Sequence, residues 1–346
     1  MTTKIKQQRI GWVDTVRGIA IFNVLISHQG LSIPLFTQFY APFYMPVFFI
    51  VSGYLFKFQT IGKNLHHIIK GLLFPYILFA FVANCAAPVF LRNIQAGTTV
   101  DYLLGIADRV LSGNIFWFIT CLIVVQIVYT LLCGLFRKQK KDIWKLILFI
   151  VGLLSIYLIQ RYEKGWLPWH IDTACFAIGL FTIGDLLKKV NIAKISQSKT
   201  WKMSSWLVLL LYIVSTLCFN WEKFGVDINV NCNIFHNTSL CLLLILLGSS
   251  AIILFSICNN IGSYVKRLGA NTLVIYCMHG FWGLGLSSFI FRLMNIDSWC
   301  PSQYVKCLLV AMVASLILLC ISYIINRYFP FLLGKFNALG KKQHRV

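Results

Sequence analysis

The sequence predicts an all-α, polytopic integral membrane protein with about ten transmembrane helices. Hydrophobic residues make up 58% of the 346-residue chain and charged residues only 12%, whereas soluble domains carry about 25% charged residues. Several apolar stretches also reach the roughly 20 residues that a helix needs to cross a bilayer. No hydrophilic stretch is long enough to build a soluble domain, so residues 1–346 are predicted to form a single transmembrane domain.

Ten segments are predicted to span the membrane: 11–30, 41–56, 71–91, 114–136, 143–160, 169–187, 203–220, 237–257, 271–291 and 304–326. With the N-terminus in the cytoplasm, 23 of the 31 Lys and Arg residues fall on the cytoplasmic side and 7 on the other side, with Arg17 inside the first segment. This bias follows the positive-inside rule and predicts cytoplasmic N- and C-termini. The net charge of +21 is then explained by topology and by contact with anionic membrane lipid. No nucleic-acid partner is needed to explain it.

The first segment contains WVDTVRGIAIFNVLISH, in which three ionisable residues interrupt an apolar run: Asp14, Arg17 and His28. Each costs at least about 2.5 kcal/mol in hydrocarbon. Arg17 and His28 are 11 residues apart, which places them within about 20° of one helical face and about 16 Å apart along the axis. Asp14 lies one turn before Arg17 and is a candidate ion-pair partner.

Two interpretations of this face are open. In the first interpretation, Asp14 and Arg17 are interfacial anchors, and His28 is an ordinary histidine at the outer boundary. Alternatively, the face lines a polar conduit, in which Arg17 binds an anionic group arriving from the cytoplasm and His28 acts as a base or nucleophile further out. The three residues occurring together favour the conduit, because an apolar residue at position 28 would suit the membrane better.

The second segment, YAPFYMPVFFIVSGYLF, carries a close-packing feature. Ser52 and Gly53 precede Tyr54, and small residues at such a position let a neighbouring helix backbone approach. Pro42 and Pro46 are expected to kink the outer half of this helix.

A short amphipathic stretch, KFQTIGKNLHHIIKGLLFPY, follows the second segment and places Lys63, His67 and Lys70 near one face. Contact with anionic lipid is the preferred interpretation. The alternative is a phosphate site for a nucleotide-bearing cofactor at the cytoplasmic mouth of the protein.

A second intramembrane histidine occurs in LGANTLVIYCMHGFW, where Tyr276 and His279 share a helical face near the middle of the bilayer. Intramembrane ionisable residues are functional candidates. Trp117 and Asp172 lie at the outer ends of their predicted helices. A Trp at that depth is usually part of the interfacial belt, whereas an Asp there is less usual.

The 12 cysteines show no metal-ligand spacing, and no metal site is expected. Cys232 and Cys300 fall in predicted outer loops and could form a disulfide. No internal repeat is evident, which counts mildly against transporter folds built from duplicated halves.

Several of these stretches resemble the acyltransferase family 3 membrane proteins. WVDTVRGIAIFNVLISH is similar to the family's first-helix signature, in which an Asp-x-x-Arg-Gly element is followed by a histidine ten residues after the arginine. MPVFFIVSGYLF, HHIIKGLLFPYI, NIFWF and NTLVIYCMH resemble further family motifs and follow in family order. The fucose 4-O-acetylase-like branch is the most similar in style, although this chain has Tyr44 where that branch commonly has a histidine.

The resemblance implies a multi-pass O-acyltransferase in a bacterial cytoplasmic membrane. Such a protein takes an acyl group, usually acetyl, from cytoplasmic acetyl-CoA or another acyl-CoA. It delivers the group to a hydroxyl of a cell-surface glycan or of its lipid-linked precursor. The resemblance also implies roles by position. The catalytic residues would be His28, Arg17 and Asp14, the cofactor-binding residues Arg17, Lys63, His67 and Lys70, and the substrate-binding residues Ser52, Gly53, Tyr54, Trp117, Asp172, Tyr276 and His279.

Two other classes of protein remain open at this stage. A transporter or flippase for glycan precursors would use Arg17 and His28 as substrate or proton sites, and would move substrate without consuming acyl-CoA. A membrane sensor or scaffold would keep the fold without turnover.

Overall fold

The computed structural model describes residues 9–31, 33–91, 107–113, 115–137, 139, 142–161, 167–218 and 221–336. The two termini, which the charge pattern places in the cytoplasm, lie outside these residues, as do residue 114 and residues 219–220 at the ends of two predicted segments.

Helices form nearly all of the described structure. They are α1 (Gly11–Ser27), α2 (Pro34–Tyr40), α3 (Pro46–Leu55), α4 (Ile61–Ile68), η1 (Ile69–Leu73), α5 (Phe74–Leu91), α7 (Trp117–Leu135), α8 (Ile143–Arg161), η2 (Pro168–His170), α9 (Ile171–Leu187), α10 (Ile192–Gln197), α11 (Lys199–Cys218), α12 (Trp221–Phe224), α13 (Thr238–Cys258), α14 (Ser263–Ala270), α15 (Thr272–Met278), η3 (His279–Gly285), α16 (Leu286–Leu293), α17 (Ile296–Trp299), α18 (Gln303–Tyr328) and η4 (Pro330–Leu333). The short strands β1 (Asp227–Asn229) and β2 (Ile234–His236) form an antiparallel hairpin between α12 and α13.

The prediction of an all-α polytopic membrane protein is confirmed. Among the described residues, eight helices are long and apolar enough to cross a membrane. Helices also occupy the other two predicted spans, but they are shorter: α1 has 17 residues and α3 has 10. Pro46 starts α3, because proline lacks the N–H that an interior helical position would need. The segment predicted to begin at 71 begins instead at Ile61, because the Thr60 side chain caps that helix by accepting from the Lys63 N–H.

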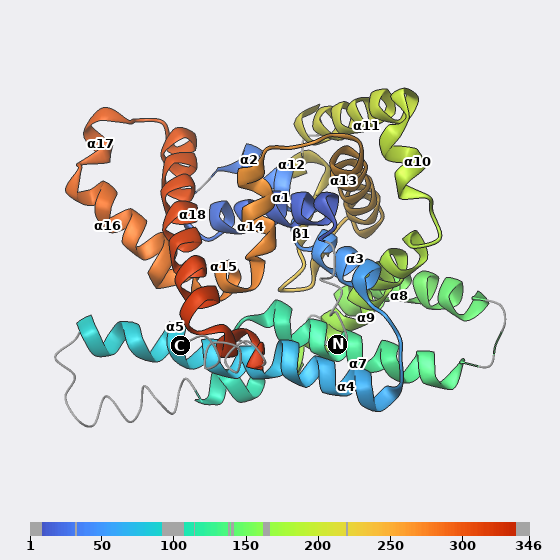
Figure 1. Ribbon diagram of the computed structural model, residues 1–346. Helices are drawn as coiled ribbons and strands as arrows, with labels where there is room; N and C mark the ends of the chain where they lie inside the picture. Colours follow the sequence, from blue (N-terminus) through green and yellow to red (C-terminus); the bar gives the residue numbers. More distant parts are fainter. Residues whose placement is uncertain are drawn as a thin grey trace.

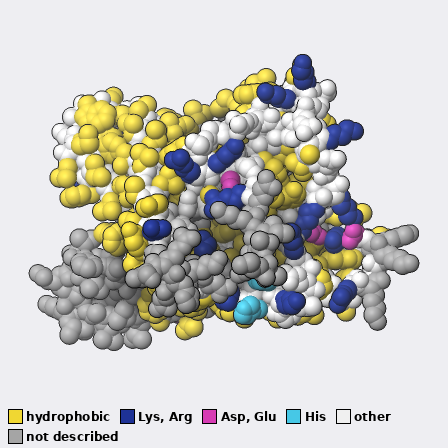
Figure 2. All heavy atoms as spheres, viewed as in Figure 1, with side chains coloured by type: hydrophobic (Ala, Val, Ile, Leu, Met, Phe, Trp, Pro, Cys, Tyr) yellow, Lys and Arg dark blue, Asp and Glu magenta, His cyan; other side chains and the backbone are white. Residues whose placement is uncertain are grey.

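The helix α1 lies in the middle of the molecule (Figure 1). It packs against α14, α13, α18 and α3. In the same view α16 to α18 stand on the left, α10 and α11 on the upper right, and α4, α5 and α7 along the bottom. Figure 2 shows hydrophobic side chains over the upper left of this face, and Lys and Arg across its centre and right.

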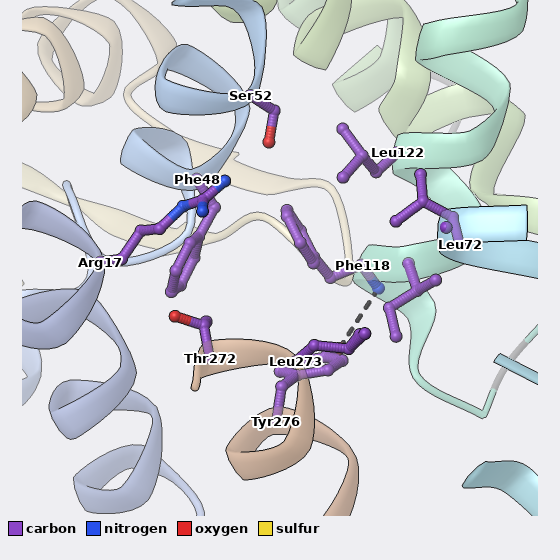
Figure 3. A pocket seen from close by; sticks show the side chains of 11 residues that line it. Arg17, Phe48, Ser52, Leu72, Phe118, Leu122, Thr272, Leu273 and Tyr276 are labelled. Atoms are coloured by element: carbon purple, nitrogen blue, oxygen red, sulfur yellow. Dashed lines mark hydrogen bonds between the residues drawn. The ribbon is translucent and has the colours of Figure 1, made fainter. Parts of the chain in front are cut away.

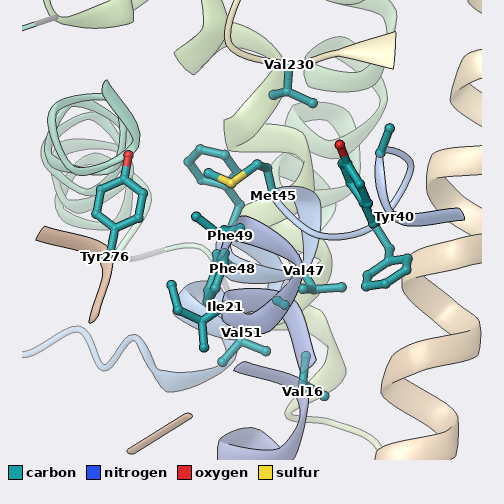
Figure 4. Close-up of a cluster of buried hydrophobic side chains, with 14 of the residues drawn as sticks. Val16, Ile21, Tyr40, Met45, Val47, Phe48, Phe49, Val51, Val230 and Tyr276 are labelled. Carbon is teal, nitrogen blue, oxygen red and sulfur yellow. The ribbon is translucent and has the colours of Figure 1, made fainter. Parts of the chain in front are cut away.

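The helix α3 is enclosed by protein along most of its length. Its Val47, Phe49 and Val51 are all fully buried. Figure 4 shows Phe49 and Val47 between Ile21 of α1 and the hairpin residue Val230, and Val51 between Ile21 and Val16 of α1. A helix enclosed in this way need not match the thickness of the bilayer.

Helices α3 and α9 approach so closely that a side chain could not fit between them. A Cβ at Gly53 would lie 1.8 Å from the Phe181 carbonyl oxygen of α9, and a Cβ at Gly184 would lie 1.7 Å from the Ile50 carbonyl oxygen of α3. The sequence-based expectation that Gly53 admits a neighbouring backbone is therefore confirmed.

A network of charged residues joins the ends of α7, α8 and α9. Asp185 of α9 is 8% exposed and accepts a hydrogen bond from the Tyr129 hydroxyl at 2.7 Å. The same carboxylate pairs with the ammonium groups of Lys145 at 2.7 Å and Lys188 at 2.5 Å. Lys188 also donates to the Phe56 carbonyl after α3. The Asp185 carboxylate thus connects α9 to α7 and α8 and, through Lys188, to the segment that follows α3.

Replacing Asp185 by Asn should destabilise the protein by about 2 kcal/mol or more, because Lys188 and the buried Tyr129 hydroxyl lose their charged acceptor and Lys145 keeps only its carboxylate contact with Asp142 at 3.2 Å. The measurement is the melting temperature in detergent. The matched control is Asp297→Asn, whose carboxylate is 77% exposed and pairs with Lys306, and exposed pairs contribute about 0–1 kcal/mol. Equal melting temperatures for the two variants would show that the network does not stabilise the fold.

Cys232 and Cys300, which the sequence left open as a disulfide pair, are both free thiols.

Candidate active site

A cavity of about 280 Å³ brings together residues of α1, α3, η1, α7 and α15. Three sequence-predicted site residues line it: Arg17, Ser52 and Tyr276. Figure 3 shows the Arg17 guanidinium, the Ser52 hydroxyl and the Thr272 hydroxyl around this space. The remaining lining residues are mostly apolar, among them Phe48, Leu72, Phe118, Ile119, Leu122 and Leu273.

Arg17 enters this cavity without a carboxylate partner. Within the described part of the chain, no Asp or Glu oxygen lies within 4.0 Å of its guanidinium. Arg17 therefore forms no salt bridge with the candidate partner Asp14, although the two charges act on each other electrostatically at longer range. An unpaired guanidinium in a mainly apolar cavity favours an anionic or strongly polar ligand, because guanidinium groups bind carboxylate and phosphate oxygens through a planar fork of N–H donors.

His28 follows the last residue of α1, and its side chain is exposed. Its Nδ1 lies 2.9 Å from the Val24 carbonyl oxygen and 3.0 Å from the Ser27 hydroxyl oxygen. A carbonyl can only accept, so Nδ1 carries the proton and donates it to Val24. In the neutral ring the lone pair is then on Nε2, which is the nitrogen available as a base or nucleophile.

His279 packs directly against His28. The two ring centroids are 4.5 Å apart in an edge-to-face arrangement at 73°. His279 Nδ1 lies 2.6 Å from the Tyr276 carbonyl oxygen, so by the same reasoning its Nε2 is also an acceptor. His279 begins the π-helix η3, and π-helical turns are frequent at functional sites.

Tyr276 links the cavity to the histidine pair. It lines the cavity, its hydroxyl accepts from the Phe118 N–H at 3.3 Å, and its ring centroid is 5.9 Å from that of His279. Going from the cavity outwards, the side chains therefore follow one another in the order Arg17, Tyr276, His279 and His28. The two histidines are not among the residues that line the 280 Å³ cavity.

Gly53 and Tyr54 lie away from this cavity. Gly53 faces α9, as described above, and the Tyr54 ring packs against the Trp12 ring of α1 at 4.8 Å between centroids. Of the Ser52–Tyr54 motif, only Ser52 lines the cavity.

The basic residues of α4 and η1 lie on the outside of the same helix that borders the cavity. Lys63 and His67 are exposed. The Lys70 ammonium lies 5.2 Å from the centre of the Phe336 ring. The two residues that follow Lys70, Gly71 and Leu72, line the cavity.

Trp117 and Asp172 do not reach the cavity. The Trp117 ring lies 5.7 Å from the His170 ring. The Asp172 carboxylate accepts from the Thr173 N–H at 2.9 Å and from the Asn233 amide at 2.9 Å. Asp172 thus holds the hairpin against the start of α9.

Sequence reasoning missed Thr272 and Phe118 as cavity residues, and the contact between the two histidines. Phe118 directly follows the selected Trp117, and Thr272 lies in the NTLVIYCMH motif one helical turn before the selected Tyr276, so their position in the chain could have indicated them. His28 and His279 are separated by most of the chain, and nothing in the sequence indicates their contact. No group of three or more metal-ligating side chains occurs among the described residues.

Comparison with known proteins gives one match. A family model described as an acyltransferase domain, of acyltransferase family 3, matches residues 10–327. Searches of the curated proteins and of the solved structures gave no match.

Proposed function

Because the chain belongs to acyltransferase family 3, whose members transfer acyl groups in membranes, we propose that it is an O-acyltransferase using cytoplasmic acyl-CoA. Acetyl is the proposed acyl group. The proposed acceptor is a hydroxyl of a cell-surface glycan or of its lipid-linked precursor, as in the fucose 4-O-acetylase-like branch. The proposed location is a bacterial cytoplasmic membrane, with both termini in the cytoplasm.

One observation carries this proposal. The unpaired Arg17 guanidinium and the Tyr276 side chain line one cavity, and Tyr276 in turn contacts the His279–His28 pair. A donor entering the cavity meets a fixed cation, and the imidazoles lie beyond it. This arrangement suits a donor whose polar or anionic part contacts Arg17 and whose thioester lies beyond Tyr276, within reach of the His28 base.

In the proposed reaction, His28 is the residue that acts on the acceptor and the thioester. The Nε2 lone pair of His28 removes the proton of the acceptor hydroxyl, and the hydroxyl oxygen attacks the thioester carbonyl carbon. The C–S bond breaks as the C–O bond forms, and the proton held on Nε2 passes to the leaving thiolate. In the alternative route Nε2 itself attacks the carbonyl carbon, and the C–S bond breaks to expel the thiolate and leave the acyl group on Nε2. The acceptor hydroxyl then attacks the acyl carbon, the N–C bond breaks to restore the imidazole, and the hydroxyl proton passes to the thiolate.

The test uses the full chain in proteoliposomes, with acetyl-CoA and a lipid-linked glycan extract of the host. Thiol release that depends on the extract, with an acetyl mass added to a glycan, is the expected result. Glycan movement across the bilayer without thiol release would favour the flippase instead.

Replacing Arg17 by Gln should raise the KM for acetyl-CoA about tenfold or more, because a charge-assisted contact to the donor is lost. Steady-state kinetics of thiol release measure this. The control is Arg267→Gln on α14, which removes the same charge from an exposed side chain. Equal KM values for the two variants would remove Arg17 from the donor site.

A further inference from the structure

A second pocket adjoins the Arg17 cavity. It has a volume of about 180 Å³, and its polar lining consists of Asn271, Asn326 and Lys335. Leu273 lines both this pocket and the Arg17 cavity. Asn271 of the second pocket also immediately precedes Thr272 of the first. One ligand could therefore occupy both.

The polar residues of this pocket form a connected chain. The Lys335 ammonium donates to the Asn326 side-chain oxygen at 2.9 Å, and the Asn326 amide donates to the Asn271 side-chain oxygen at 3.1 Å. An ammonium has three N–H donors, and this arrangement holds Lys335 in place while leaving donors for a ligand.

Further cations lie around Lys335. Partial burial and the nearby Arg9 guanidinium both lower the pKa of Lys335, which lies beyond the last membrane-spanning helix. From a third element, the Lys70 ammonium lies over the ring of Phe336, the residue that follows Lys335. Bringing like charges together is unfavourable unless an anion compensates them.

We propose that this pocket binds the phosphate groups of the donor's nucleotide head, with Lys335 as the principal cation and Asn326 positioning Lys335. This inference rests on the proposed function for the identity of the donor. It places the phosphates beside Lys335 and not on the α4 residues Lys63 and His67, which line neither pocket. The thin pantetheine arm then continues past Leu273 into the Arg17 cavity.

The experiment measures binding of coenzyme A and of pantetheine, which lacks the nucleotide, to the full chain by calorimetry. Lys335→Gln should weaken coenzyme A binding about tenfold and leave pantetheine binding unchanged. Lys335→Arg should retain most of the coenzyme A affinity. The matched control is Lys194→Gln on α10, an exposed lysine outside both pockets, which should bind coenzyme A like the unmodified chain.

Two results would overturn the inference. One is equal coenzyme A affinity for Lys335→Gln and Lys194→Gln. The other is a selective loss in Lys63→Gln, which would place the phosphates on α4. Binding is independent of turnover, so the two proposals fail separately. Selective loss of coenzyme A binding without acyl transfer would refute the proposed function alone, whereas acyl transfer with unaltered affinity in Lys335→Gln would refute this inference alone.

Discussion

Replacing His28 by Ala is expected to lower the rate of acyl transfer by about 10²–10⁴-fold, the usual contribution of a general base. The loss follows from removing Nε2, the nitrogen left unprotonated because Nδ1 donates to the Val24 carbonyl. Stability should change little, since His28 is exposed and lies after the end of α1. The measurements are single-turnover rates in proteoliposomes and mass spectrometry of the host's surface glycans.

The matched control for this variant is His66→Ala, which removes an exposed imidazole from α4. It should leave glycan acetylation unchanged. Unaltered acetylation in His28→Ala would remove the assigned role of His28. Acid quenching with radiolabelled acetyl-CoA separates the two routes, because only the nucleophilic route yields an acetyl group bound to the unmodified protein and none bound to His28→Ala.

The second large effect concerns stability. Gly53→Ala should destabilise the fold by about 3 kcal/mol or more and lower the melting temperature by about 10 °C. The new Cβ would lie 1.8 Å from the Phe181 carbonyl oxygen, and a backbone atom cannot turn aside as a flexible side chain can. Helices α3 and α9 would have to separate, and α3 carries Ser52 of the cavity.

Gly62→Ala is the control for this substitution. Gly62 is also helical, but nothing lies within 4 Å of a Cβ built there. Alanine should then stabilise α4 by about 0.5–1 kcal/mol, because glycine is a poor helix former. If Gly53→Ala kept the melting temperature and lost only acyl transfer, Gly53 would be a site residue, as the resemblance implies, and its packing role would be minor.

The fold class and the helices could be predicted because hydrophobic length is a local signal. The helical face of Arg17 was equally local, since it follows from 100° per residue. The ends of α3 and α4 could not be predicted in this way. Surrounding protein lets α3 stay short, and the cap at Thr60 extends α4 towards the N-terminus.

The features of the site that could not be predicted depend on contacts between segments far apart in the sequence. Tyr276 and Ser52 were candidates from their motifs, but their meeting with Arg17 in one cavity depends on how α1, α3 and α15 pack. Asp172 was a candidate from its depth in the membrane, whereas its partner Asn233 belongs to a hairpin that no sequence pattern predicts. Periodicity predicts which residues share a helical face, but it does not predict which element packs against that face.

The central claim is that the donor's pantetheine arm lies in the Arg17 cavity and directs its thioester past Tyr276 towards His28. A structure of the full chain with a non-hydrolysable acetyl-CoA thioether tests it directly. The account predicts a pantetheine arm along Leu273 and Thr272, with the acyl carbonyl beyond Tyr276 and within about 3–4 Å of Nε2 of His28. An analogue bound elsewhere, with the 280 Å³ cavity empty, would contradict it.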